Sequence, residues 1–320
     1  MPKVLKNIIG SAAFIAILAV LLIVSSIIVK PGSTVKVNAL QDPLVNGILA
    51  ENKNSIDVVF LGDSESYSAF IPLKIWRDRG ITSYVCGTSS QELCYSYELL
   101  TKSFKTQKPK IVVLETNAIF RNFSRSSVIS TKAQGLFAVF RYHDRWKSLQ
   151  PKSWTLSADK TYDDRSKGYL YNTTMNGASV DGYMATTDEK EQISSENSKY
   201  VEKIRDYCRK KGAELVLVSV PSTKNWNMRK HNAVTELSKK LGIEYIDMNL
   251  LSGEIPIDWK RDTRDRGDHM NFTGAMKVSA YMGDSFASKN IFRDKRNDAA
   301  YKNWNDYAAE FAESTGNQLA

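Results

Sequence analysis

Residues 57–65 read Asp-Val-Val-Phe-Leu-Gly-Asp-Ser-Glu, in which four consecutive apolar residues are followed by a glycine and a polar triplet. A continuous apolar run of this length is typical of a strand that is buried on both faces of a parallel sheet. The glycine suits a tight turn after the strand. The segment therefore predicts an interior strand with Ser64 just past its carboxyl end.

Outward from this segment, short β-branched runs alternate with longer helical stretches. Strands are predicted at residues 57–61, 81–86, 111–115, 214–220 and 243–247. Helices are predicted at residues 72–79, 91–105, 191–211, 229–241 and 272–287. Such alternation is typical of a parallel sheet with helices on both faces. The predicted fold class is therefore α/β, built on a parallel five-stranded sheet.

Several polar or small residues follow the predicted strands directly. Ser64, Gly87, Asn117 and Pro221 each lie just past a strand end. In parallel sheets the ligand site forms at the carboxyl ends of the strands, so these residues are expected to converge at one edge. His269 lies far along the chain in a polar loop. A serine hydroxyl needs such a base, and a third group to orient the base, before it becomes a useful nucleophile.

Four blocks of the chain resemble the SGNH/GDSL hydrolase superfamily. They are Gly62-Asp63-Ser64, the glycine at position 87, the asparagine at position 117, and Asp268-His269. The resemblance covers roughly residues 56–289. It is to the membrane-anchored branch of alginate O-acetyltransferase proteins and D-alanyl-lipoteichoic-acid transfer proteins, and it implies a three-layer flavodoxin-like fold.

The resemblance implies roles for these residues in acyl transfer. Ser64 is the nucleophile, and His269 takes its proton and later returns one to the leaving group. The backbone amides of Ser64 and Gly87 and the side-chain amide of Asn117 form the oxyanion hole. Loss of one such donor typically slows a reaction by about 10²–10³.

The group that orients His269 is left open. The family places an aspartate three residues before the histidine, and that position is Arg266. Asp265 and Asp268 are the candidates. Adjacent residues in an extended loop point in opposite directions, which favours Asp265. Asp268 fits if the loop turns tightly, and a dyad without an essential aspartate is a third alternative.

The N-terminus carries a long apolar segment. Residues 8–29 contain no charged residue. At ~1.5 Å per residue they would form a helix about 33 Å long, enough to cross a hydrocarbon core of about 30 Å. The alternative is a cleaved signal peptide with its cleavage site near Val37-Asn38-Ala39, although a signal core usually has only about 7–15 residues. We expect a single-pass protein of the cell membrane with its catalytic domain outside the cytoplasm.

Four segments follow from these patterns. Residues 1–30 are expected to form a cytoplasmic stub and transmembrane anchor, residues 31–55 a juxtamembrane linker, residues 56–290 the catalytic domain, and residues 291–320 a C-terminal tail. Within the domain, residues 119–189 lack strand–helix alternation and are rich in aromatic and basic side chains. An excursion this long is often functional. It is interpreted as a helical cap, as a surface facing the membrane or a partner, or as extra structure completing the core.

Charge and cysteine content constrain the partners. The formal net charge of +9 suits anionic lipid heads or an anionic polymer, or simply keeps the protein soluble. No nucleic-acid module is recognisable, so nucleic acid is not an expected partner. Cys86, Cys94 and Cys208 are interpreted as small buried residues. The three histidines are scattered, and neither a metal nor a cofactor is expected.

The expected function is an extracytoplasmic serine-dependent O-acyltransferase that modifies a cell-surface polysaccharide or teichoic acid, with acetyl favoured over D-alanyl. The resemblance implies a multi-pass membrane-bound O-acyltransferase as partner. A carbohydrate esterase of the same fold and a non-catalytic binding or scaffold subunit are the alternatives. A second Gly-Asp-Ser, at residues 283–285, falls within a predicted helix and is assigned no role.

Overall fold

The computed structural model describes residues 2–31, 42–149, 154 and 164–316. The chain divides into two compact units. One consists of Met1–Ala39 and Ser124–Tyr162, and the other of Leu40–Phe123 and Asp163–Ala320. The expected cleavage site at residues 37–39 lies outside the described residues.

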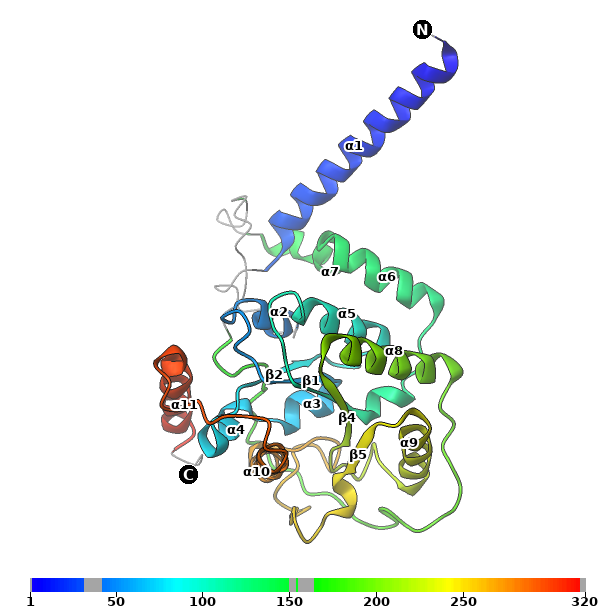
Figure 1. Ribbon diagram of the computed structural model, residues 1–320. Helices are drawn as coiled ribbons and strands as arrows, with labels where there is room; N and C mark the ends of the chain where they lie inside the picture. The colour runs from blue at the N-terminus through cyan, green and yellow to red at the C-terminus, as the bar shows by residue number, and fades with distance from the viewer. Residues whose placement is uncertain (1, 32–41, 150–153, 155–163, 317–320) are drawn as a thin grey trace. The chain divides into compact units, whose positions relative to one another are not determined.

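The larger unit is built on a five-stranded parallel sheet with the strand order β2-β1-β3-β4-β5 (Figure 1). The strands are β1 Val58–Gly62, β2 Ser83–Gly87, β3 Ile111–Glu115, β4 Glu214–Ser219 and β5 Glu244–Asp247. This is the strand order of flavodoxin-like doubly wound folds. The predicted α/β class with five parallel strands is confirmed, and each strand lies within two residues of its predicted bounds.

Helices cover both faces of the sheet (Figure 1). Around the sheet lie α3 Ser64–Ala69, α4 Pro72–Arg79, α5 Leu93–Ser103, α8 Ser195–Lys211, α9 Met228–Leu241 and α10 Phe272–Ser288. The main core lies between the sheet and α4 and α10, where Phe60 stacks on Phe70 with ring centroids 4.3 Å apart and also meets Phe286. Burial of each such side chain contributes roughly 1.5–3 kcal/mol. Helices α5 and α8 pack on each other and on the sheet.

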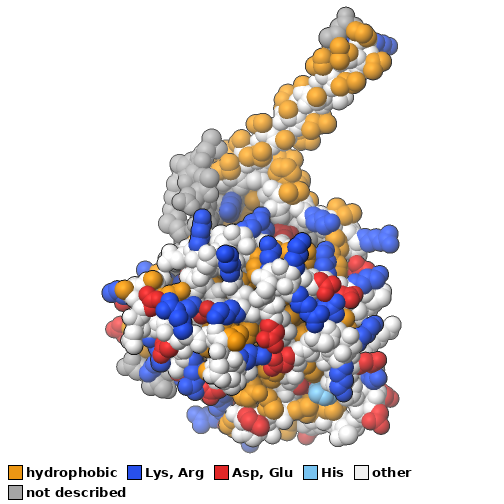
Figure 2. Space-filling model, viewed as in Figure 1, with side chains coloured by type: hydrophobic (Ala, Val, Ile, Leu, Met, Phe, Trp, Pro, Cys, Tyr) orange, Lys and Arg blue, Asp and Glu red, His pale blue; other side chains and the backbone are white. Residues whose placement is uncertain are grey.

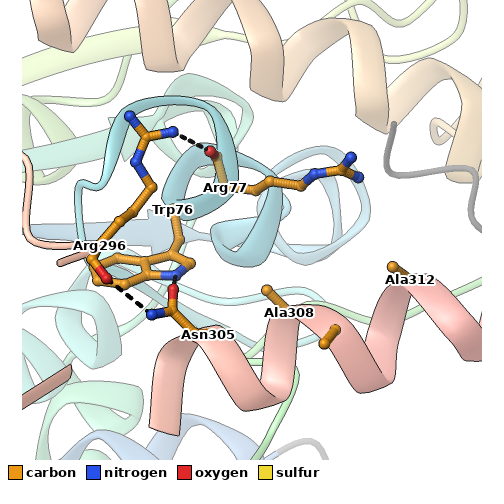
Figure 3. A pocket seen from close by; sticks show the side chains of 7 residues that line it. Trp76, Arg77, Arg296, Asn305, Ala308 and Ala312 are labelled. Carbon is orange, nitrogen blue, oxygen red and sulfur yellow. Dashed lines mark hydrogen bonds between the residues drawn. The ribbon is translucent and has the colours of Figure 1, made fainter. Parts of the chain in front are cut away.

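Residues 291–320, expected as a tail, contain a helix that the sequence analysis did not predict. Helix α11, Lys302–Ser314, packs on α4, and Trp304 is only 1% exposed, with its ring 5.4 Å from that of Trp76. A cavity of about 380 Å³ lies between α4 and α11, and Figure 3 shows Asn305 accepting a hydrogen bond from the Trp76 indole at its edge.

The described part of the expected linker, residues 42–55, packs on the larger unit. It contains α2, Asp42–Asn46, and a 3-10 helix η1, Gly47–Leu49. Val45 and Ile48 are buried. The Gln107 side chain holds the segment, because its amide oxygen accepts hydrogen bonds from the backbone N–H groups of Ser55 and Ile56. The boundary at residue 56 therefore differs from the structure, in which core packing begins earlier.

The smaller unit contains α1, Lys3–Val29, together with α6 Arg125–Leu136, α7 Val139–Tyr142 and a 3-10 helix η3 His143–Ser148. Over an 18-residue window α1 has a mean hydropathy of 3.0, and it is mostly exposed. Its length and composition fit a membrane span or a signal sequence. The excursion at residues 119–189 is thus divided between the two units.

Candidate active site

Ser64 is the first residue of α3, directly after the turn that ends β1. Gly62 has φ +158°, and a Cβ there would lie 2.6 Å from the Cβ of Glu115, so a side chain does not fit. Asp63 caps α3, because its Oδ1 accepts a hydrogen bond of 3.0 Å from the backbone N–H of Glu65. Each residue of the Gly-Asp-Ser block thus has a separate local role in presenting the serine.

The structure brings Ser64, His269 and Asp265 together. Ser64 Oγ lies 2.7 Å from His269 Nε2. Asp265 Oδ2 lies 2.6 Å from His269 Nδ1, and Asp265 Oδ1 accepts from the His269 backbone N–H at 2.7 Å. The ring can therefore accept the serine proton on one nitrogen while the aspartate fixes its tautomer through the other.

A tight turn explains why Asp265 reaches the ring. Arg266 and Gly267 both have positive φ, 62° and 89°, so the chain reverses between Asp265 and His269. The sequence argument favoured Asp265 by assuming an extended loop, which the structure does not have. Asp268 Oδ1 lies 3.7 Å from His269 Nδ1 and accepts from the Asn225 amide instead. Burial opposes ionisation of Asp265, but the hydrogen bonds from His269 hold the pKa of Asp265 below its usual value.

The histidine loop is supported by the second half of the excursion. Asn176 exchanges backbone hydrogen bonds with Thr263 and Arg266, and its side-chain amide donates to the Arg264 carbonyl at 2.9 Å. Ser222 Oγ contacts the carbonyl oxygens of Gly267 and Asp268, each at 2.9 Å. The sequence analysis missed this support, because the segment around Asn176 has no regular periodicity.

Two expected oxyanion donors lie at the same sheet edge. Gly87 ends β2 opposite Gly62, and a Cβ at position 87 would lie 2.2 Å from Ser66 Oγ. Asn117 lies in the 3-10 helix η2, Thr116–Phe120, directly after β3. Its Nδ2 donates to Asp63 Oδ2 at 3.0 Å, which holds the amide beside the residue that precedes the nucleophile.

Three buried acidic side chains lie under this edge: Asp63, Glu65 and Glu115. Arg121 is the counter-ion of Asp63, with its Nη2 2.9 Å from Oδ2. Burial raises the pKa of Glu65 and of Glu115 well above the usual value, and the neighbouring carboxyl groups raise both further. Sequence reasoning did not find this cluster, because glutamate is rarely buried and its position alone carries no signal.

Asn225 joins this cluster to the histidine loop. Its Nδ2 donates to Glu65 Oε1 at 2.6 Å and also to Asp268 Oδ1. Lys230 Nζ donates to the Asn225 carbonyl at 2.6 Å and lies 3.3 Å from Asn117 Oδ1. Burial lowers the pKa of Lys230, although Glu115 opposes this shift. A continuous polar network therefore connects the residue after the nucleophile with the residue before the base.

Glu65, Asp268 and His269 could offer ligands to a metal ion, since their candidate atoms lie within 4.8 Å of one another. Both ring nitrogens of His269 already contact Ser64 and Asp265, so a metal would compete with that arrangement. His231 lies elsewhere, with its Nδ1 2.7 Å from Asp247 Oδ2.

No family model matches the chain, and no curated protein matches it. Among solved structures, the chain is similar to a lipase/acylhydrolase from Enterococcus faecalis, with 11% identity, a TM-score of 0.41, and coverage of 73% of this chain and 97% of the other. It is also similar to a GDSL-like lipase from Bacteroides thetaiotaomicron, with 10% identity, a TM-score of 0.37, and coverage of 77% and 99%. A third similar structure is the esterase EstA from Pseudoalteromonas sp., with 11% identity, a TM-score of 0.38, and coverage of 74% of this chain and 99% of the other. At such low identities and TM-scores, the activity of the chain has to be inferred from its own side chains.

Proposed function

We propose that the chain is a membrane-anchored serine O-acyltransferase that acylates a cell-surface glycopolymer outside the cytoplasm. The observation that carries the proposal is the contact of 2.7 Å between Ser64 Oγ and His269 Nε2, with Asp265 on the other ring nitrogen. A hydroxyl, an imidazole and a carboxylate in this order are what nucleophilic acyl chemistry requires.

The reaction begins when His269 Nε2 accepts the Ser64 proton as Oγ attacks the carbonyl carbon of an acyl donor. The carbonyl π electrons move to oxygen, where the backbone amides of Ser64 and Gly87 and the Asn117 amide stabilise the charge. The tetrahedral intermediate then collapses to an acyl-serine, and the leaving group takes the proton from His269. In the second half, a sugar hydroxyl gives its proton to His269 and attacks the carbonyl carbon of the acyl-serine. The resulting tetrahedral intermediate collapses by breaking its bond to Ser64 Oγ, which takes the proton back from His269, and the acylated sugar is released.

The N-terminal helix supports transfer at the membrane rather than in free solution. A span at residues 8–29 would place the catalytic unit next to the outer membrane surface, where a multi-pass O-acyltransferase could supply acyl groups. The net charge of +9 suits an anionic acceptor polymer. We propose acetyl as the acyl group and a polysaccharide or teichoic acid as acceptor.

A serine-directed fluorophosphonate probe tests the chemistry on the full-length protein. We expect the wild-type chain to be labelled and Ser64→Ala to remain unlabelled. Equal labelling of the two would contradict the proposal and favour a binding or scaffold subunit. Ser285→Ala, in the second Gly-Asp-Ser, is the matched control and should label like wild type.

A second experiment separates transfer from hydrolysis, because an esterase would use the same residues. The protein is incubated with an activated acetyl ester and a soluble oligosaccharide acceptor, and the products are followed by mass spectrometry. Acetylated oligosaccharide that depends on Ser64 is the expected result. Release of free acetate without any transfer product would contradict the transferase and favour the esterase.

A further inference from the structure

Helix α6 is exposed along its whole length, since each of its 12 residues is at least partly exposed. Ile129 is 69% exposed and Leu136 is 77% exposed. A helix of a soluble domain usually buries one apolar stripe against its neighbours. Two large aliphatic side chains at this exposure therefore indicate a surface that none of the residues described in the structure covers.

The exposed aliphatic residues share one face of α6 with basic residues. At 3.6 residues per turn, Ile129, Lys132 and Leu136 fall on the same side as Arg125. Ser130 and Gln134 lie away from this face. Long basic side chains can lie along apolar surface and keep their charged ends at the level of the lipid headgroups, so they are compatible with aliphatic side chains on a face that meets a membrane. Figure 2 shows hydrophobic and basic side chains next to one another over α6.

The segment that follows α6 has the same character. It carries three basic residues, Arg141, Arg145 and Lys147, and a single acidic one, Asp144, which pairs with Lys147 at 3.3 Å. Trp146 is 65% exposed and Phe140 is 45% exposed. Exposed tryptophan at the level of lipid headgroups is typical of membrane proteins, and the excess positive charge complements anionic lipids.

Helix α7 and the 3-10 helix η3 are fixed to the C-terminal end of α1. The backbone N–H of Val139 donates to Ser26 Oγ at 3.1 Å, and the Arg145 guanidinium donates to the Val29 carbonyl. Val29 is the last residue of α1. If α1 spans the bilayer, these bonds place α7 and η3 at the depth where the span leaves the hydrocarbon core.

We infer that α6, α7 and η3 form an interfacial platform that binds the phospholipid surface beside α1, with Ile129 and Leu136 inserted among the lipids and Arg125 and Lys132 at the phosphate groups. This inference rests on the membrane anchor of the proposed function, but not on its chemistry. The continuity with α1 and the excess of positive charge favour lipid over a protein partner.

Site-directed spin labelling of the full-length protein in vesicles of phosphatidylcholine and phosphatidylglycerol tests the platform. Single cysteines replace Ile129 and Leu136 on the platform face, Ser130 and Gln134 away from it, and Ile17 within α1. The native cysteines Cys86, Cys94 and Cys208 are buried, so the label is directed to the introduced ones. At each position, the frequency of collisions between the spin label and oxygen, which partitions into lipid, is compared with the frequency of collisions between the label and a water-soluble nickel chelate.

We expect collisions with oxygen to be the more frequent at positions 129 and 136, and collisions with the nickel chelate to be the more frequent at positions 130 and 134. Nickel access at all four positions, with position 17 still protected, would overturn the platform while leaving the anchor intact. Nickel access at position 17 as well would overturn the anchor itself and the platform with it. Lys132→Glu, or vesicles without phosphatidylglycerol, should increase nickel access at position 136; no change would contradict the assigned role of charge.

Discussion

Asp63 organises the surroundings of the nucleophile, although it does not contact the Ser64 hydroxyl in the proposed reaction. Its side chain is fully buried, and its oxygens accept hydrogen bonds from the Glu65 backbone, the Asn117 amide and the Arg121 guanidinium. The aspartate of the Gly-Asp-Ser block is thus a positioning residue. It joins the start of α3 to the end of β3, where a proposed oxyanion donor lies.

The two candidate aspartates should differ strongly when each is replaced by asparagine. Asp265→Asn removes the charge that holds His269 in the productive tautomer, and loss of such a group typically lowers kcat by about 10⁴. Asp268→Asn should have a much smaller effect, because Asp268 contacts Asn225 rather than the ring at bonding distance. Steady-state turnover of an activated ester measures both. Equal losses, or a larger loss for Asp268→Asn, would contradict the geometry.

The buried glutamates predict a pH dependence of stability. Because folding raises the pKa of Glu65 and Glu115, the folded state keeps protons that the unfolded chain has already lost above about pH 4.5. Their stabilising contribution is complete below that pH and is lost as the pH rises through the folded pKa values, by up to about 1.4 kcal/mol per group and pH unit. We therefore expect the free energy of unfolding to fall as the pH rises above about 4.5.

The double variant Glu65→Gln/Glu115→Gln should show a smaller fall over the same range, since an amide stays neutral and can still accept hydrogen bonds. Urea denaturation at each pH measures the difference. The matched control is Glu236→Gln, at an exposed glutamate paired with Lys190. If the double variant and the wild-type chain lose the same free energy, the two acids are not the source of the pH dependence.

At the scale of the elements, the meeting of β2 with α3 leaves no room for a side chain at Gly87. Gly87→Ala would bring a Cβ to within 2.2 Å of Ser66 Oγ, which itself donates to the Asp63 carbonyl. Such overpacking typically costs about 1–3 kcal/mol, and here it also displaces the turn that presents Ser64. Urea midpoints and fluorophosphonate labelling should both decrease. Gly253→Ala, where a Cβ meets no neighbour, should change neither.

The elements that could be predicted from the sequence are those whose pattern reports burial directly. Strand β1 is a continuous apolar run because both of its faces are covered, and its five residues are all buried. Helix α11 has such a pattern too, since Trp304, Ala308 and Phe311 recur at helical spacing, and the expectation of a tail overlooked it. The segment around Asn176 was missed for another reason, because irregular hydrogen bonds leave no periodicity in the sequence.

The same distinction holds at the site. Ser64, Gly87 and Asn117 follow strand ends, so topology alone placed them near one edge. His269 was proposed from the base that a serine nucleophile needs and from the family resemblance. Asp265 could be proposed but not separated from Asp268, because the choice depends on the turn at Arg266 and Gly267. Glu65 and Asn225 could not be proposed, since their contact joins residues that lie far apart in the chain.

At the scale of the whole molecule, one buried lysine joins three distant segments of the larger unit. Lys167 is 1% exposed, and its Nζ lies 2.5 Å from Glu51 Oε1. The same ammonium group lies 5.0 Å from the centre of the Trp304 ring and 4.6 Å from that of Tyr307, both in α11. The segment before β1, the second half of the excursion and helix α11 therefore meet around the ammonium group of Lys167.

Removal of that charge should destabilise the larger unit without altering its chemistry. Lys167→Met removes the ammonium group that pairs with the Glu51 carboxylate, and breaking a buried ion pair in this way typically costs about 3–5 kcal/mol. The double variant Lys167→Met/Glu51→Leu should recover much of the loss, because it removes both charges of the pair together. Urea denaturation measures the free energy of unfolding of the wild-type chain, of Lys167→Met, of Glu51→Leu and of the double variant. The rate of fluorophosphonate labelling, at a temperature where all variants are folded, should match that of the wild-type chain. A double variant as unstable as the sum of the two single variants would show that the ion pair does not couple the three segments.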